Sequence, residues 1–157
     1  MTGLIAQYPL GGVTWDYLQY VLGLSQLGHD VYYLEDTGLW PFNPQEGGVA
    51  KDGSFNVDYL AGVMDRFGLQ DKWLYRFPGQ NQWYGLSGRQ RKEVIKSADL
   101  LINVSGTLAN PAEYRSIRKL AYIDSDPVFT QVKLARGQVD FQRMVDIHDV
   151  QFSFGEC

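Results

Sequence analysis

Two glycines directly before an expected helix are the first residues whose types and spacing suggest chemistry. The stretch PLGGVTWD carries Gly11 and Gly12, followed by Thr14 and Asp16. Glycines let a backbone approach a ligand closely, and the free N–H groups at a helix start attract anions or sugar hydroxyls. A plain tight turn explains the two glycines equally well. The stretch matches neither the G-x-G-x-x-G fingerprint nor the G-K-[ST] of a phosphate loop, so no nucleotide is identified.

Asp16 is the carboxylate best placed to act as a general base. We expect Thr14 to cap the helix and Asp16 to lie in its first turn, facing the glycine loop and a neighbouring crevice. The alternative is a first-turn acid that compensates the helix dipole and never touches a substrate. Trp15 beside it is expected to line a groove, because aromatic faces pack on sugars and flat ligands, or to pin its loop to the core.

Asp124 and Asp126, in the stretch IDSDP, have two interpretations. Carboxylates spaced D-x-D can hold a divalent cation against a diphosphate, because hard cations prefer oxygen ligands. In the other interpretation Asp126, directly before Pro127, caps the next helix and leaves only Asp124 for ligand contacts. We favour the second, since D-x-D is common by chance.

The histidines and the cysteine indicate no metal centre and no nucleophile. His29 and His148 each precede an expected strand, and neither fits a Ser/His/Asp arrangement or a G-x-S-x-G elbow. Cys157, the last residue, is the single cysteine, which excludes an internal disulfide and a cysteine-based metal site. We expect no metal and no cofactor in this chain.

Composition and charge exclude several classes of protein. The chain has 157 residues, 45% of them hydrophobic and 20% charged, which is typical of one globular domain. A net charge of −4 argues against a nucleic-acid partner, and the basic stretch GRQRKEVIK is best explained as the solvent face of a helix. No apolar run is long enough for a membrane span, and the N-terminus does not resemble a signal peptide, so we expect a cytoplasmic protein.

Hydrophobic periodicity predicts alternating strands and helices along the whole chain. We expect a long loop over residues 37–54 and a further loop at FPGQNQWYG, residues 77–85, within the otherwise unassigned stretch 68–86. The expected strands are residues 3–7, 30–36, 99–106, 119–126 and 150–156. The expected helices are residues 15–27 with Gly28 as the stop, 57–67, 88–98 capped by Ser87, a short helix from Pro111, 127–137, and 138–146 with Val139, Met144 and Val145 facing inward.

This alternation predicts an α/β fold, a three-layer Rossmann-like sandwich with a mainly parallel sheet, in a single domain over residues 1–157. In that architecture ligands bind outside the carboxyl ends of the strands. The segments YPLGGVT, EDTG, NVSG and DSDP follow expected strands, so they should meet at one crevice. The residues expected to border it are Gly11, Gly12, Thr14, Trp15, Ser105, Gly106, Asp124 and Asp126, with Asp16 as the base.

The stretch GGVTWDYLQYVLGLSQLGHDVYYLED, followed by LLINVSG, AYIDSDPVFTQVK and HDVQFSFGE, resembles the N-terminal half of a bacterial glycosyltransferase of the two-Rossmann-domain (GT-B) type. The resemblance spans nearly all of the chain, and DSDPVFTQVK is its most specific part. It implies that this domain binds a small-molecule or glycan acceptor. It also implies that a C-terminal domain, absent from this chain, binds a nucleotide-sugar donor without a metal.

Two departures from this family pattern affect the expected function. Many GT-B enzymes carry a histidine in the loop after the first strand, whereas this loop has Tyr8 and no histidine. The chain also stops at FSFGEC, where a full enzyme would cross into its donor domain, so we expect the isolated chain to be inactive. Two alternatives stay open: a stand-alone Rossmann-like module that binds a nucleotide or small metabolite, and a metal-dependent enzyme that uses Asp124 and Asp126.

Overall fold

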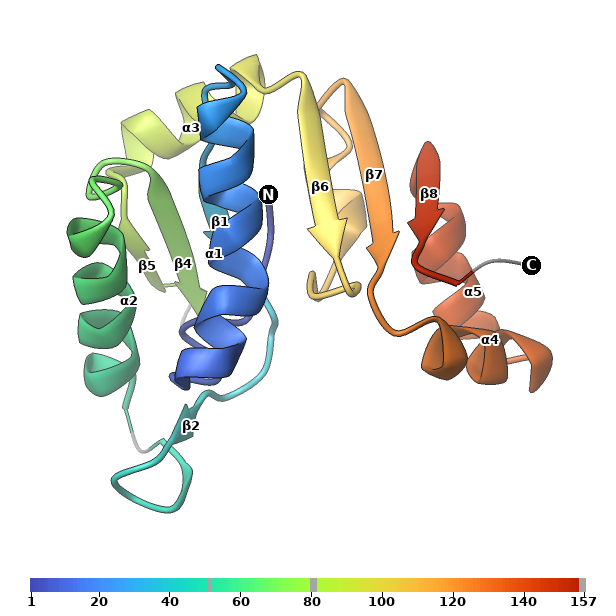
Figure 1. Cartoon of the computed structure of the whole chain (residues 1–157), viewed down its shortest axis with the longest axis horizontal. Helices are drawn as coiled ribbons and strands as arrows, with labels where there is room; N and C mark the ends of the chain where they lie inside the picture. Colours follow the sequence, from blue (N-terminus) through green and yellow to red (C-terminus); the bar gives the residue numbers. More distant parts are fainter. Residues whose placement is uncertain (51, 80–81, 156–157) are drawn as a thin grey trace.

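The computed structural model describes residues 1–50, 52–79 and 82–155, which form a mixed α/β fold (Figure 1). Within these ranges, no helix has the length and apolar character needed to cross a membrane. The elements in chain order are α1 (Gly11–Gln26), β1 (Tyr33–Glu35), β2 (Phe42–Asn43), β3 (Gly48–Val49), α2 (Ser54–Arg66), β4 (Trp73–Phe77), β5 (Gln82–Gly85), α3 (Gly88–Ser97), β6 (Leu100–Val104), the 3₁₀ helix η1 (Pro111–Tyr114), β7 (Lys119–Asp124), α4 (Pro127–Ala135), α5 (Val139–Asp146) and β8 (Val150–Ser153).

The strands form three sheets. In the first, β4 pairs with β1 in parallel and with β5 in antiparallel fashion. The second is the short antiparallel ribbon β2-β3 within the long loop. The third, β6-β7-β8, is entirely parallel. The expected α/β class is confirmed, while a single three-layer Rossmann-like sandwich stays a prediction.

Helices pack on both faces of the first sheet. Leu18 of α1 and Met64 of α2 share a core cluster with Tyr33 of β1, and Figure 1 shows both helices on one side of the sheet. The next residue along β1, Leu34, belongs instead to a second cluster that Val94 of α3 packs against. Successive strand residues point to opposite faces, so the alternation of β1 is what separates the two clusters.

The first residues of the chain connect the two larger sheets. Thr2 forms a parallel bridge with Leu34 of β1, and its N–H donates to the Ile102 carbonyl of β6 over 2.9 Å. The Thr2 hydroxyl also donates to Asn103 Oδ1 over 3.1 Å. The N-terminus therefore lies between β1 and β6 and hydrogen bonds to both.

The strand expected over residues 3–7 is wrong, because residues 5–7 form a turn. The Ile5 N–H donates to the Tyr33 hydroxyl over 2.9 Å, and the next two N–H groups donate to the carboxylate of Glu35. Side chains of β1 thus take the donors that a strand ladder would have used.

The loop expected at FPGQNQWYG is also wrong in part, since its last four residues form β5 and pair with β4. Residues 80 and 81 of that stretch lie outside the described ranges. Gly85 has a φ of +85°, and a Cβ there would lie 2.2 Å from the Trp73 carbonyl oxygen. Only glycine fits this end of the hairpin.

The start of α1 differs from the expectation. The helix begins at Gly11, with Leu10 as its N-cap, so Thr14 is not the cap. The Thr14 hydroxyl lies inside the helix and donates back to the Leu10 carbonyl over 3.0 Å. Asp16 consequently lies beyond the first turn, where its effect on the helix dipole falls off. The helix stop at Gly28, with a φ of +89°, is confirmed.

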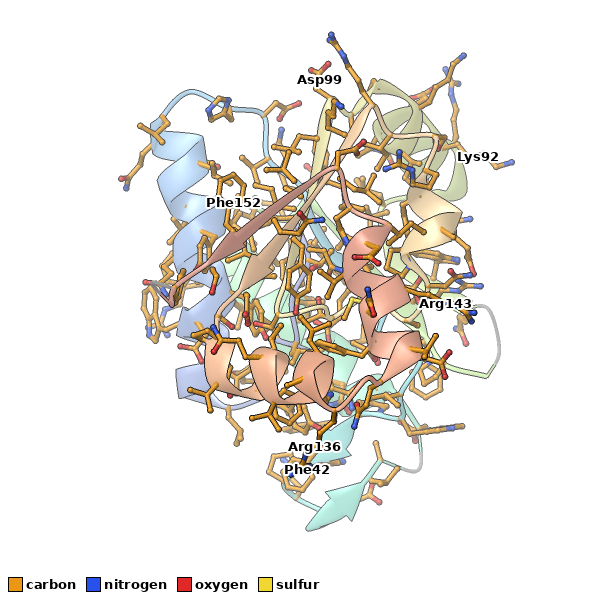
Figure 2. The ribbon with its side chains drawn as sticks, turned by 90° about the vertical axis from the view of Figure 1, so that its right-hand side faces the viewer. Phe42, Lys92, Asp99, Arg136, Arg143 and Phe152 are labelled. Atoms are coloured by element: carbon orange, nitrogen blue, oxygen red, sulfur yellow. The ribbon has the colours of Figure 1, made fainter. Side chains whose placement is uncertain are left out.

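The C-terminal elements form where expected but bury little. Asp126 caps α4 with Pro127 in its first turn, and the capping box at Ser87 is also present on α3. Val139 on α5 was expected to face inward and is instead 57% exposed. All four residues of β8 are exposed. Figure 2 looks onto this side of the molecule, with Phe152 labelled on β8.

Candidate functional site

A cavity of about 220 Å³ lies where α1 passes the carboxyl ends of the parallel strands β6, β7 and β8. One turn of α1 forms one wall, and the turns after β6 and β7 and the residue that follows β8 form the other. The lining residues are Asp16, Tyr17, Gln19, Tyr20, Val104, Ser105, Ser125 and Phe154. The cavity is therefore at the edge of the sheet where α/β proteins bind ligands.

The turn after β6 holds Ser105 in a conformation that L-residues seldom adopt. Its φ of +57° is the only positive value of a non-glycine residue in the described ranges. Such a conformation costs about 1–3 kcal/mol and concentrates at functional sites. Gly106 follows at +64°, and a Cβ there would meet Met144 Cε at 2.9 Å. The pair thus turns the chain sharply and presents the Ser105 side chain at the cavity.

Two hydroxyls lie side by side in this wall. Ser105 Oγ and Ser125 Oγ are in short hydrogen-bond contact, although they come from different strand ends. Tyr17 on the opposite wall lies near the Ser105 side chain. Burial raises the pKa of Tyr17 above its usual value, the Ser105 side chain lowers it, and the charge of Asp16 raises it. Hydroxyl groups from both walls therefore face the cavity.

Asp16 supplies the only charge among the described lining residues. Its side chain is exposed, and within the described part of the chain it takes part in no hydrogen bond or ion pair. It raises the pKa of Tyr20, for which burial is the larger cause. A free carboxylate beside hydroxyl and aromatic groups can accept a proton or a hydrogen bond from a bound polyol.

The other residues expected around Asp16 lie elsewhere. Gly11 and Gly12 are exposed, and a Cβ at either would meet nothing within 4 Å. Thr14 is buried, with its hydroxyl 2.8 Å from that of Tyr59 on α2. Trp15 packs edge-on against Phe67 with ring centroids 5.5 Å apart. The first turn of α1 thus faces solvent and α2, while its second turn lines the cavity.

Asp124 and Asp126 do not line the cavity either. Asp124 is buried and accepts from the Thr130 hydroxyl over 2.7 Å and from the Asp126 N–H over 3.2 Å. Asp126 caps α4 by accepting from the Phe129 N–H over 3.3 Å. The capping interpretation of Asp126 is confirmed, and Asp124 orders the same turn. Among the described residues no three acid, histidine or cysteine side chains gather as a metal site would require.

The EDTG segment does not line the cavity, and its Asp36 instead forms hydrogen bonds within the protein. Asp36 accepts from the Tyr114 hydroxyl over 2.7 Å and from Arg76 over 3.2 Å. His148 is also internal, with its Nε2 3.1 Å from Asn103 Nδ2. Of the four strand ends expected to share one crevice, those after β6 and β7 do so.

Glu35 is a buried acid that the sequence analysis did not single out. Its carboxylate accepts from the N–H groups of Ala6 and Gln7 over 2.8 and 2.5 Å, and from the Tyr33 hydroxyl over 2.6 Å. Burial raises the pKa of the Glu35 carboxyl to about 7, although these hydrogen bonds lower it. Glu35 therefore anchors the segment that leads into α1, and hence the wall that carries Asp16.

Six of the lining residues were missed from the sequence: Tyr17, Gln19, Tyr20, Val104, Ser125 and Phe154. Helical spacing was a usable signal for Tyr20, which lies one turn after Asp16. Ser125 lies between Asp124 and Asp126, and those two residues were expected at the site in its place. Phe154 gave no signal, because its place depends on how β8 pairs with β7.

A second cavity, of about 430 Å³, lies at the opposite ends of β1 and β6. Its walls are mostly apolar, with Val31, Leu101 and Ile102 among them. It is larger than the first cavity, and its lining also includes polar side chains, among them His29, Asp30 and Asp99. It lies at the amino ends of the strands, however, whereas α/β proteins bind ligands outside the carboxyl ends. We therefore take the smaller cavity as the candidate site.

No family model, curated protein or solved structure matches the chain. The cavity and its lining residues are therefore the basis for the proposed function.

Proposed function

We propose that this chain is the acceptor-binding domain of a GT-B-type glycosyltransferase, a Rossmann-like domain that works with a separate nucleotide-sugar domain. The observation that supports this most is the shared cavity of Asp16 and Ser105 at the carboxyl ends of parallel strands. Both residues were expected there from the sequence.

In this proposal each wall of the cavity has a role. The Ser105 and Ser125 hydroxyls hydrogen bond to the acceptor, and the ring of Tyr20 packs on its apolar face. Asp16 accepts the proton of the attacking hydroxyl as the sugar is transferred, which is the work of a general base. The donor diphosphate is bound by the second domain, so this cavity needs no cation and no phosphate cradle.

The alternative function, a stand-alone module for nucleotides or small metabolites, is less well supported for nucleotides. A nucleotide is an anion, and the described lining residues include an acid and no basic side chain. A neutral or cationic ligand suits this lining better.

Binding of simple glycosides to the chain tests the proposal. We expect methyl glucoside to bind weakly to the wild type and about tenfold more weakly to Ser125→Ala, which loses a hydrogen bond. Ser25→Ala is the matched control, because Ser25 is exposed on α1 away from the cavity. Saturation-transfer NMR gives the affinities.

Two results would contradict the proposal. Tight binding of uridine diphosphate by this chain would mean that this domain, and not the separate donor domain, recognises the nucleotide. Sugar transfer catalysed by the chain alone would show that no second domain is needed.

A further inference from the structure

The charge of the candidate site carries information about its ligand. Asp16 is the only charged side chain among the described lining residues, and no described residue pairs with it. A neutral polyol would leave this carboxylate without a countercharge, whereas a ligand with an ammonium group would supply one.

We propose that the acceptor is an amino sugar whose ammonium group pairs with Asp16; this rests on the proposed function and narrows its substrate class. One carboxylate oxygen accepts from the ammonium group, and the other accepts from the neighbouring hydroxyl that attacks the donor. A carboxylate has lone pairs enough for both hydrogen bonds. The unit that it recognises is therefore a vicinal amino alcohol.

The rest of the lining fits such a ligand. The rings of Tyr17, Tyr20 and Phe154 add aromatic faces, which attract cations as well as the C–H face of a sugar. The adjacent hydroxyls of Ser105 and Ser125 remain for the uncharged ring hydroxyls. The net charge of −4 adds a field that favours a cationic ligand over an anionic one.

The test compares three ligands that differ in one substituent: methyl 2-amino-2-deoxyglucoside, its N-acetyl derivative and methyl glucoside. Because Asp16 is exposed, we expect the amino glycoside to bind about two- to fivefold more tightly than the other two at low salt. The preference should shrink in about 0.5 M salt, where exposed charges are screened.

Variants assign the preference to Asp16. Asp16→Asn should abolish it, while Asp58→Asn, an equal charge change at an exposed position on α2, should retain it. Asp16→Lys should reverse it, so that methyl glucuronide becomes the best ligand. Circular dichroism of each variant verifies that the fold is kept.

Equal binding of the three glycosides to the wild type would overturn this inference but would remain consistent with the proposed acceptor-binding function. The same preference in wild type and Asp16→Asn would also overturn it. If none of the glycosides binds, both the inference and the proposed function fail.

Discussion

The two ends of the chain place their apolar side chains differently. In residues 1–124, Leu18, Tyr33 and Leu60 are each 0% exposed within a continuous core. In residues 127–155, Val128 is 70% exposed and Phe154 64%, and α5 contains no buried residue. Helices, strands and caps are therefore formed in both regions, but only the first region has the burial that stabilises a domain.

The candidate site lies along the boundary between these regions. Asp16 and Tyr17 belong to the well-packed part, whereas Ser125 and Phe154 belong to the end of the sheet with the exposed elements. Segments with little buried apolar surface open at lower free energy than core segments. We infer that the α1 wall is the fixed side of the cavity and that the β8 side is the one that adjusts to a ligand.

The largest expected effect separates the two regions directly. Leu18→Ala should lower the free energy of unfolding by about 2–5 kcal/mol, because it leaves a cavity in the core. Phe152→Ala removes a larger side chain that is 56% exposed and should cost less than about 1 kcal/mol. Urea unfolding measures both, and equal losses would show that β8 is packed as firmly as α1.

The next effect is the pH dependence that Glu35 imposes on the well-packed region. The folded pKa of Glu35 is about 7, above its ordinary value of 4.5, so its contribution to stability is present below about pH 4.5 and is lost as pH rises through 7. The loss amounts to about 3 kcal/mol at 1.36 kcal/mol per pKa unit. It should appear in urea unfolding at a series of pH values.

A control variant isolates this effect. Burial lowers the pKa of the Met1 amine to about 5, which makes stability rise with pH and opposes Glu35. The informative quantity is therefore the difference in unfolding free energy between wild type and Glu35→Gln at each pH. The wild type should lose stability relative to Glu35→Gln as the pH rises from about 4.5 to 7. A difference that does not change with pH would refute the assigned pKa.

The smallest expected effect compares two helix caps. Ser87→Ala and Asp126→Ala each remove a capping side chain, at a cost of about 0.5–2 kcal/mol. Because α4 buries only Thr130, the loss of Asp126 should increase amide exchange within α4 and leave the core amides protected. Uniform loss of protection across β1 and β6 would show instead that α4 unfolds together with the core.

The sequence predicted best the elements whose signals are local. The cap at Ser87, the glycine stop at Gly28 and the Asp126-Pro127 start of α4 were all expected and are all present. Each depends on residues within one helical turn, so no knowledge of distant contacts was needed.

The errors have a common cause, which is contact between segments far apart in the chain. Residues 3–7 contain an apolar run typical of a strand, but the side chains of Tyr33 and Glu35 accept hydrogen bonds from the N–H groups of residues 5–7. Strand β5 was missed because Pro78 and Gly79 favoured a loop over the whole stretch and because its pairing partner, β4, was not recognised. Local patterns cannot reveal which distant donor or acceptor takes a given backbone group.

Only part of the candidate site was predicted from the sequence. Asp16 and Ser105 were identified from a helix start and a strand end, and both line the cavity. Gly11 and Trp15 were expected beside them, but neighbouring residues of a helix project about 100° apart, so Trp15 packs on Phe67 while Asp16 faces the strand ends. The angular position of each residue around α1 thus decides which side chains meet the strand ends.

The most direct test of the account is a map of amide chemical shifts as methyl 2-amino-2-deoxyglucoside is added to the labelled chain. The account predicts that the largest shifts fall on the lining segments, residues 16–20, 104–106, 125 and 154, and extend along β8, the side that adjusts to the ligand. Shifts confined to the apolar cavity around Val31 and Leu101, or no shifts at all, would contradict it.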